Sequence, residues 1–246
     1  MITMKIYLIR HSITEGNLKK RYIGRTDESL CMEGETLLKE RLAKGMYPEA
    51  DRIFVSPMKR CIQTAQILYP SQELTVIDEF SECDFGKFEN KNYEELKDMP
   101  EYQRWLKSGG AMRFPEGESK ESFTKRSLAG FERALLMCGC DKQMLEGRYK
   151  PVGGKAASGF SMAVFVVHGG TIMSIMERYA VPKGTYYDFQ IGNGEGYELI
   201  LADDFAAFGR IYSGLNTGRS GVALSSGADD RIFDHMDGKN YKRLSA

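Results

Sequence analysis

The stretch Leu8-Ile9-Arg10-His11-Ser12-Ile13-Thr14-Glu15-Gly16-Asn17 carries an apolar run directly into a histidine. Lys5 to Ile9 has the pattern of a short strand, so His11 lies where that strand ends. A second apolar run, Met162 to Val167, ends in the same way at His168. In open α/β sheets, ligands bind outside the carboxyl ends of the strands. We therefore expect the two histidines to face one another across a crevice, although two unrelated strand-end histidines would give the same pattern.

Short apolar runs alternate with longer amphipathic ones along the chain, which is typical of an α/β sheet covered on both faces. The predicted strands are Lys5 to Ile9, Arg52 to Val55, Leu74 to Ile77, Met162 to Val167 and Tyr197 to Leu201. The predicted helices are Glu33 to Lys44, Lys59 to Leu68, and one that begins near Ser119 or Ser122 and ends before Gly139. We expect a three-layer sandwich with a mostly parallel central sheet, helices on both faces, and a helical lid subdomain between Asp84 and Glu118.

One turn signal follows the second predicted strand, and another precedes the fifth. Ser56-Pro57 follows the second strand and predicts a helix start, with Ser56 as the N-cap and Pro57 at the first helical position. Arg60 then falls in the first helical turn. Gly192 to Gly196 predicts a tight turn before the fifth strand.

The residues next to the two histidines indicate a binding site for an anion. Arg10 precedes His11, Arg60 follows the second strand by one turn, and the helix that Gly169 opens offers free N–H groups and a favourable dipole. Two arginines, two imidazoles and a helix start predict an electropositive pocket for a dianion such as a phosphoryl group.

Two carboxyl groups lie in the loop after the third strand, in Phe80-Ser81-Glu82-Cys83-Asp84-Phe85-Gly86. A carboxylate beside a phosphate pocket repels the ligand, so an acid at this place suggests proton transfer to a leaving oxygen.

Five blocks of sequence, in order, resemble the motifs of the histidine phosphatase superfamily, whose members include phosphoglycerate mutases and broad small-molecule phosphatases. The blocks are Leu8 to Asn17, Ser56 to Ala65, Ser81 to Gly86, Phe114 to Ser119 and Val166 to Gly170, and they span residues 5 to about 200. Three positions depart from the motifs: Ser12 replaces a glycine, Ile13 replaces a glutamate, and Ser81 stands where an arginine often precedes the acid.

The resemblance implies a role for individual residues. His11 would be the nucleophile that becomes phosphohistidine. Glu82 would be the general acid and then the base, and it is preferred to Asp84 because its spacing to Gly86 fits the motif. The phosphoryl oxygens would be held by Arg10, Arg60, His168, Asn17 and Gly169. This two-step displacement implies neither a metal nor a cofactor.

The residues after the nucleophile loop are candidates for contact with the rest of the substrate. Arg21, Tyr22, Gly24 and Arg25 resemble the corresponding stretch of α-ribazole phosphatase-like members more than that of the glycolytic mutases. The expected function is hydrolysis of a small phosphorylated metabolite, with α-ribazole phosphate as a candidate substrate. A cofactor-dependent phosphoglycerate mutase and a non-catalytic phospholigand-binding module are the alternatives.

Composition narrows the class of protein. In 246 residues, 34 Lys and Arg balance 34 Asp and Glu, which argues against a nucleic-acid or anionic-membrane partner. The longest apolar run has six residues, whereas a membrane-spanning helix needs about 20. The amino terminus shows no secretory signal pattern. Five scattered cysteines favour a reducing cytoplasm over a disulfide framework.

The pattern along the chain predicts a single catalytic domain over residues 1–212. Gly-rich residues 139–161 are expected to be a loop insertion, and residues 213–246 a C-terminal extension of low order. The sequence leaves the oligomeric state open.

Overall fold

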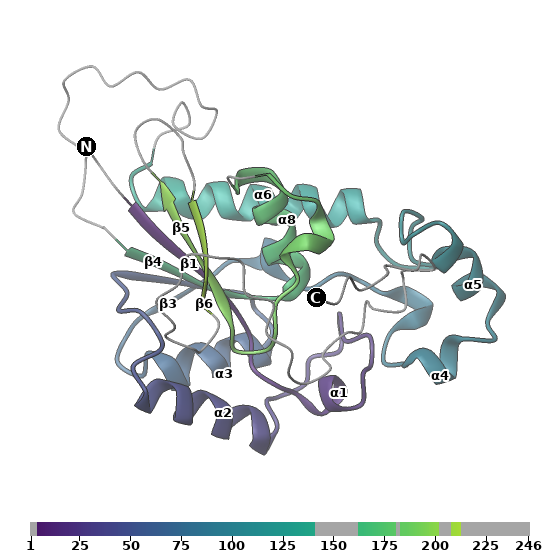
Figure 1. Cartoon of the computed structure of the whole chain (residues 1–246), viewed down its shortest axis with the longest axis horizontal. Coiled ribbons are helices and arrows are strands. Elements are labelled where there is room, and N and C mark those ends of the chain that lie inside the picture. Colours follow the sequence, from purple (N-terminus) through teal and green to yellow (C-terminus); the bar gives the residue numbers. More distant parts are fainter. Residues whose placement is uncertain (1–3, 141–161, 181–182, 202–207, 213–246) are drawn as a thin grey trace, which may run out of the picture.

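The computed structural model describes residues 4–140, 162–180, 183–201 and 208–212. Its strands form one sheet in the order β3-β2-β4-β1-β5-β6 (Figure 1). They are β1 (Met4–Arg10), β2 (Arg52–Val55), β3 (Leu74–Val76), β4 (Met162–Val167), β5 (Gly196–Leu201) and β6 (Phe208–Tyr212). Of these strands only β5 runs against the others, since β1, β4, β2 and β3 pair in parallel and β6 pairs antiparallel with β5. The predicted mostly parallel α/β sheet is confirmed.

Helices cover both faces of the sheet, with α6 and α8 on one side and α2 and α3 on the other (Figure 1). The helices are α1 (Glu15–Leu18), α2 (Met32–Ala43), α3 (Lys59–Leu68), α4 (Tyr93–Leu96), α5 (Pro100–Lys107), α6 (Lys120–Met137) and α8 (Gly169–Tyr179). Three short 3₁₀ segments join them: η1 (Asp78–Phe80), η2 (Gly86–Phe88) and η3 (Tyr186–Phe189).

The two faces of the central strands pack into separate hydrophobic clusters because side chains alternate along a strand. In β4, Phe165 and Val167 belong to the cluster under α6 and α8, whereas Val164 and Val166 belong to the cluster under α2 and α3. All four of these side chains are fully buried. A strand buried on both faces is a continuous apolar run, which is why the sequence predicts the bounds of β4 correctly.

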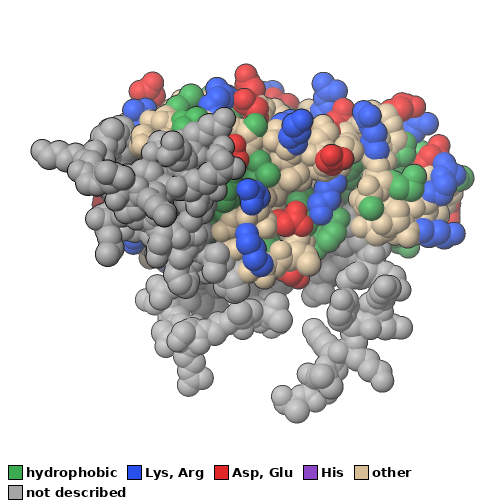
Figure 2. Space-filling view, turned by 90° about the horizontal axis from the view of Figure 1, so that it is seen from above, with side chains coloured by type: hydrophobic (Ala, Val, Ile, Leu, Met, Phe, Trp, Pro, Cys, Tyr) green, Lys and Arg blue, Asp and Glu red, His purple; other side chains and the backbone are tan. Residues whose placement is uncertain are grey.

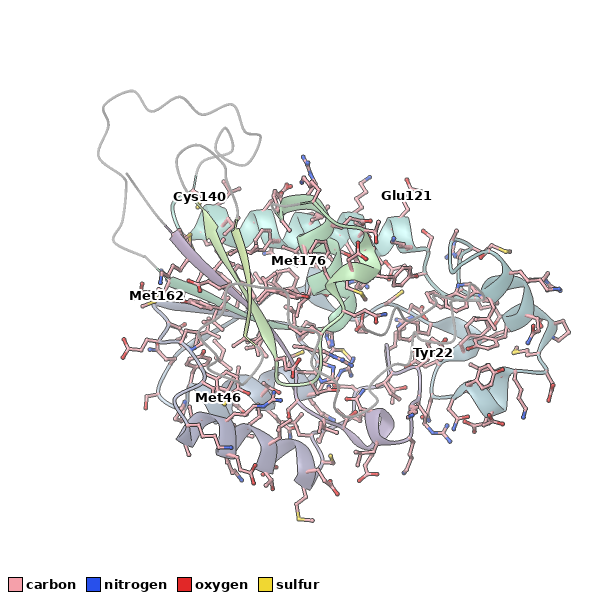
Figure 3. The ribbon with its side chains drawn as sticks, viewed as in Figure 1. Tyr22, Met46, Glu121, Cys140, Met162 and Met176 are labelled. Carbon is pink, nitrogen blue, oxygen red and sulfur yellow. The ribbon has the colours of Figure 1, made fainter. Side chains whose placement is uncertain are left out.

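The lid is a third cluster, built mainly from aromatic side chains between α4, α5 and the start of α6. Trp105 packs at 4.9 Å from Phe114 and 5.7 Å from Phe88, between ring centroids. Tyr22 joins this cluster from the loop that follows α1 and lies beside the lid rings in Figure 3. The remaining members are Cys83, Phe85, Leu96, Tyr102 and Phe123. The lid is therefore held to the rest of the molecule by its own apolar core.

Two local predictions differ from the structure. α3 begins at Lys59, with Met58 as its N-cap and no side-chain cap, so the prediction of Ser56 as the N-cap is wrong. The Ser56 hydroxyl lies instead 2.7 Å from Nε2 of His168, the residue that follows β4. Arg60 still falls in the first turn of α3. The sequence analysis also missed β6.

The N-cap of α6 is Ser119, whose hydroxyl accepts a hydrogen bond from the backbone N–H of Ser122. Apart from residues 139 and 140, the predicted loop insertion lies outside the described residues, as does the predicted extension over 213–246. No helix in the described parts of the chain is long and apolar enough to span a membrane. On the face shown in Figure 2, basic and acidic side chains are interspersed.

Replacing Phe165 by alanine tests the packing between the sheet and α6. The Phe165 ring stacks on Phe54 at 5.0 Å and meets Phe131 at 5.1 Å, with no exposed surface. Phe165→Ala should lower the free energy of unfolding by about 3–5 kcal/mol, because the lost ring leaves a cavity. The measurement is equilibrium unfolding in urea. Met32→Ala, at a side chain 78% exposed, is the control and should change stability by less than about 0.5 kcal/mol; equal losses would contradict the packing described.

Candidate active site

The two strand-end histidines lie together at the carboxyl edge of the sheet. β1 and β4 are neighbours in parallel register, and the backbone N–H of His11 donates to Val167 O at 2.9 Å. The ring centroids of His11 and His168 are 5.2 Å apart, with an angle of 66° between the planes. The sheet therefore brings together two imidazoles that are 157 residues apart in the chain, as the sequence predicts.

The protonation of His11 follows from its contacts. Its Nδ1 lies 2.7 Å from the backbone oxygen of Ser12, which can only accept a hydrogen bond. Nδ1 therefore carries the hydrogen and Nε2 keeps its lone pair. Burial, followed by the charges of Arg60 and Arg10, holds the pKa of His11 well below the ordinary value of 6.5. The imidazole is neutral near pH 7 and has a nucleophilic nitrogen.

His168 is fully buried and is the N-cap residue of α8. Its Nε2 lies 2.7 Å from Ser56 Oγ, and its Nδ1 lies 3.8 Å from Glu82 Oε2. Burial and then the positive charge of Arg60 hold the pKa of His168 well below 6.5. A second neutral imidazole therefore stands beside the first.

Arg60 is a fully buried cation. Its guanidinium donates to the backbone oxygens of Thr26 at 2.9 Å, Gly24 at 3.0 Å and Ile23 at 3.4 Å. Within the described residues no carboxylate forms an ion pair with Arg60, and its Nε has no hydrogen-bond partner. A buried charge is costly unless it is paired, so this arrangement is suited to an anionic ligand.

The other cationic groups complete the pocket. Arg10 donates from Nη1 to the backbone oxygen of Ile191 at 2.6 Å. A Cβ atom added to Gly169, the first residue of α8, would lie 3.6 Å from Arg10 Nε. The start of α8 thus adjoins the Arg10 side chain, and both favour negative charge at the same place.

Glu82 brings an acid to this pocket. Only 11% of its side chain is exposed, and Oε1 accepts a hydrogen bond from the backbone N–H of Cys83 at 2.8 Å. Burial raises the pKa of the Glu82 carboxyl above its ordinary value and outweighs the opposing effect of the nearby arginines. A Cβ at Gly170 would lie 3.1 Å from Glu82 Oε1, so the glycine permits the acid to approach α8 closely.

Asp84, the other candidate acid, is engaged elsewhere. Its Oδ1 accepts from the backbone N–H of Gly86 at 3.0 Å, and its Oδ2 pairs with Arg25 at 3.1 Å. It is Glu82 that lies next to His168, in agreement with the motif spacing.

Most of the chain matches a known protein family. The family model of the histidine phosphatase superfamily (branch 1) matches residues 6–212.

The chain belongs to the histidine phosphatase superfamily.

Similar proteins carry several names. The "Putative phosphoserine phosphatase 2" of Hydrogenobacter thermophilus is 27% identical over 178 residues, covering 70% of this chain and 76% of that protein. The adenosylcobalamin/alpha-ribazole phosphatase of Salmonella typhimurium is 25% identical over 208 residues, covering 82% of this chain and 93% of that protein. Other relatives are named "Probable phosphoglycerate mutase GpmB". The crystal structure of the alpha-ribazole phosphatase from Shigella flexneri has the same fold, with a TM-score of 0.66 at 20% identity, covering 89% of this chain and 100% of that chain.

One departure from the superfamily motif is accommodated by hydrogen bonds. The hydroxyl of Ser12 donates to the backbone oxygen of Gly34 at 2.7 Å, and its backbone N–H donates to Thr64 Oγ1 at 3.0 Å. A Cβ at Gly34 would lie 2.2 Å from the backbone oxygen of Ile13, so α2 packs tightly on the nucleophile loop. The serine is thereby held between α2 and α3 without displacing the backbone beside His11.

Asn193 is a functional candidate that the sequence analysis missed. Its Nδ2 donates to the backbone oxygens of His11 at 3.0 Å and Ser12 at 3.3 Å, and to Asn17 Oδ1 at 3.1 Å. Asn17 Oδ1 also accepts from the backbone N–H of Thr14, so Nδ2 is the side-chain donor that Asn17 can offer to a phosphoryl group. The predicted turn at Gly192 to Gly196 was the only signal for Asn193 in the sequence.

Arg126 of α6 was also missed. It forms a bidentate ion pair with Glu118, at 2.9 and 2.8 Å. The same guanidinium donates to the backbone oxygens of Glu79 at 2.9 Å and Glu82 at 3.0 Å, and to that of Ser81. Arg126 thus ties the acid loop to α6. The block Phe114 to Ser119, which contains Glu118, was the available signal.

The residues predicted to contact substrate lie between the nucleophile loop and the lid. Tyr22 is 3% exposed in the lid core, and its hydroxyl lies 3.2 Å from that of Tyr102. Arg21 pairs with Glu95 at 3.1 Å. A Cβ at Gly24 would lie 1.9 Å from the backbone oxygen of Cys83. These contacts give Tyr22 and Gly24 roles in packing, and their predicted contact with substrate stays a prediction.

Arg25 differs from those three residues. Its side chain is 74% exposed and pairs with Asp84, so it lies at the surface beside the acid loop. Among the described side chains, no group of three or more His, Cys, Asp or Glu is arranged to hold a metal ion.

The histidine titrations test the electrostatics of the pocket. Protonation would place a charge in a buried site beside two arginines, so His11 and His168 should both stay neutral at pH 6.5 and titrate well below it. The ring C–H signals can be followed by NMR from pH 8 to pH 4.5 and assigned with His11→Gln and His168→Gln. A midpoint at or above 6.5 for either ring would contradict the described site.

Proposed function

We propose that this protein hydrolyses a small phosphomonoester in two displacements through phosphohistidine on His11. The observation that carries the proposal is the geometry of His11, a buried neutral imidazole whose Nδ1 is bonded to the Ser12 carbonyl and whose Nε2 is free to attack. Arg60, a buried cation with no carboxylate ion pair among the described residues, supplies the binding site for the phosphoryl group.

In the first displacement, the lone pair of His11 Nε2 forms a bond to phosphorus as the bond from phosphorus to the ester oxygen breaks. The leaving oxygen takes the proton of Glu82, a carboxyl whose pKa is raised by burial. Arg10, Arg60 and the start of α8 stabilise the charge on the phosphoryl oxygens. The Ser12 carbonyl stabilises the positive charge that develops on the imidazole.

In the second displacement, water attacks phosphorus as the bond between phosphorus and Nε2 breaks. The Glu82 carboxylate takes a proton from this water and so returns to its starting state. The products are inorganic phosphate and neutral His11. Every proton is carried by Glu82 or by the reacting oxygens, so the steps balance without a metal or cofactor.

The proposed substrate is a class of compounds, the small phosphomonoesters. The relatives carry the names of phosphoserine, alpha-ribazole and phosphoglycerate enzymes, so the shared element is the phosphomonoester. α-Ribazole phosphate is one candidate within that class. The described cysteines are buried free thiols, which suits a reducing compartment, and we place the activity in the cytoplasm.

The site bears differently on the two alternatives. A non-catalytic binding module has no need of a buried acid with a raised pKa in this site, and Glu82 is such an acid, 3.8 Å from His168. A cofactor-dependent phosphoglycerate mutase would use His11 in the same way but return the phosphoryl group to its substrate, so only an assay of the products separates it.

The activity test compares release of inorganic phosphate with transfer of the phosphoryl group back to the substrate, as a mutase would do. The wild-type chain should release phosphate from p-nitrophenyl phosphate, and His11→Ala should reduce the rate to background because the nucleophile is lost. The surface variant Met32→Ala should match the wild type. Rapid interconversion of 2- and 3-phosphoglycerate with negligible phosphate release would overturn the phosphatase proposal. Quenched turnover should leave a label on His11 that is stable in alkali and labile in acid.

A matched pair of variants tests the acid. Glu82→Gln should lower kcat by about 10²–10⁴-fold on an alkyl phosphate, whose leaving oxygen needs a proton, and by less on p-nitrophenyl phosphate. Asp84→Asn is the control, since its carboxylate is occupied by Gly86 and Arg25, and it should lose much less activity. Steady-state kinetics on both substrates gives the comparison. A larger loss in Asp84→Asn would assign the acid to Asp84.

A further inference from the structure

The Ser56 hydroxyl, predicted to cap α3, is used by the site instead. We propose that Ser56 is a positioning residue that holds His168 in the tautomer with its hydrogen on Nδ1, so that this ring donates a hydrogen bond to a phosphoryl oxygen. The inference rests on the proposed function for its catalytic consequence, but the tautomer itself is a property of the protein without substrate.

The sheet places Ser56 opposite His168. β2 pairs in parallel with β4, with Val55 beside Val166, and the backbone N–H of Ser56 donates to Val166 O at 3.1 Å. Ser56 and His168 therefore continue two neighbouring strands past the same edge. Both side chains are fully buried, so water does not compete for the 2.7 Å contact between Oγ and Nε2.

The direction of this hydrogen bond follows from the hydroxyl hydrogen of Ser56. The Oγ accepts a hydrogen bond from the backbone N–H of Met58 at 3.4 Å, which leaves the hydroxyl hydrogen to be donated. Because Ser56 is fully buried, this hydrogen needs an acceptor in the protein, and His168 Nε2 lies 2.7 Å away. Nε2 accepts, and in a neutral ring the hydrogen must lie on Nδ1.

The other side chains at the ring are Cys61 and Glu82. Cys61 Sγ lies 3.6 Å from Nε2 and 3.8 Å from Nδ1, so the thiol packs against the buried ring without distinguishing its two nitrogens. The Ser56 hydroxyl lies at Nε2, whereas Oε2 of Glu82 lies 3.8 Å from Nδ1.

The consequence concerns the ligand. The oxygens of a phosphoryl dianion only accept hydrogen bonds, so a ring nitrogen that meets one must carry a hydrogen. If Nε2 carried the hydrogen instead, the lone pair of Nδ1 would face the phosphoryl oxygen and repel it. Burial keeps the His168 ring neutral, and a neutral ring has one hydrogen. Ser56 fixes that hydrogen on Nδ1, from where it can be donated to the ligand.

The test reads the tautomer directly. The chain contains three histidines, so ¹⁵N-histidine labelling gives a spectrum in which each ring can be assigned with His11→Gln and His168→Gln. In the wild-type protein without substrate, at pH 7.5, two-bond ¹H–¹⁵N correlations should show His168 with its hydrogen on Nδ1. Ser56→Ala should shift His168 to the Nε2–H tautomer or to a mixture, and Ser56→Thr, which keeps the hydroxyl, should restore the wild-type pattern.

Ser127→Ala is the matched control, because Ser127 is another fully buried serine whose hydroxyl has no hydrogen-bond partner among the described residues. It should leave both the tautomer and the activity unchanged. Ser56→Ala should lower kcat by about 10-fold or more, as expected for a group that orients an imidazole, and Ser56→Thr should recover part of that loss.

Two results would overturn the proposal: wild-type His168 with its hydrogen on Nε2, or Ser56→Ala folded and still in the Nδ1–H tautomer. The first needs no variant, so it decides the question even if Ser56→Ala does not fold. Neither depends on turnover. An inactive wild-type protein with the expected tautomer would therefore count against the proposed function and not against this role of Ser56.

Discussion

The burial of the Arg60 guanidinium is the constraint on which the site depends. Three backbone oxygens of residues 23–26 accept its hydrogen bonds, and those oxygens must be held in place by the rest of the fold. Glu89 does so by accepting from the backbone N–H groups of Gly24 and Thr26, each at 2.9 Å. Gly24 in turn lies so close to the Cys83 carbonyl that no Cβ would fit. One buried cation therefore links the lid, the acid loop and α3.

The same cation sets the protonation of the groups around it. Arg60 is the largest charge effect on both His11 and His168, after burial, and it favours the neutral ring in each case. Burial acts on Glu82 in the opposite sense to the arginines and is the larger effect, so the pKa of this carboxyl is raised. The site thus combines fixed positive charge with two neutral imidazoles and an acid of raised pKa. That combination suits an anionic ligand and leaves the imidazole nitrogens unprotonated.

The sequence predicts features that depend on local interactions and misses features that depend on contacts between distant residues. β4 and the helix over Lys59 to Leu68 were predicted with their observed bounds, because apolar periodicity is a local property. The N-cap role of Ser56 was wrong because α3 begins at Lys59 and the Ser56 hydroxyl contacts a ring nitrogen of His168, 112 residues away. Asn193 and Arg126 were missed because their acceptors lie 182 and 44 residues away, at His11 and Glu82.

By itself, the sequence determined the α/β class, the order of the motif blocks and the residue types that can hold and transfer a phosphoryl group, because these depend on residue identity, local periodicity and spacing. Only the tertiary structure decided which side chains meet. It placed Glu82 rather than Asp84 beside His168, placed Tyr22 in the lid core, and brought Ser56 and Asn193 to the two histidines. The physical reason is that hydrogen bonds and desolvation depend on contacts between distant segments, which pairing of β1, β2 and β4 creates.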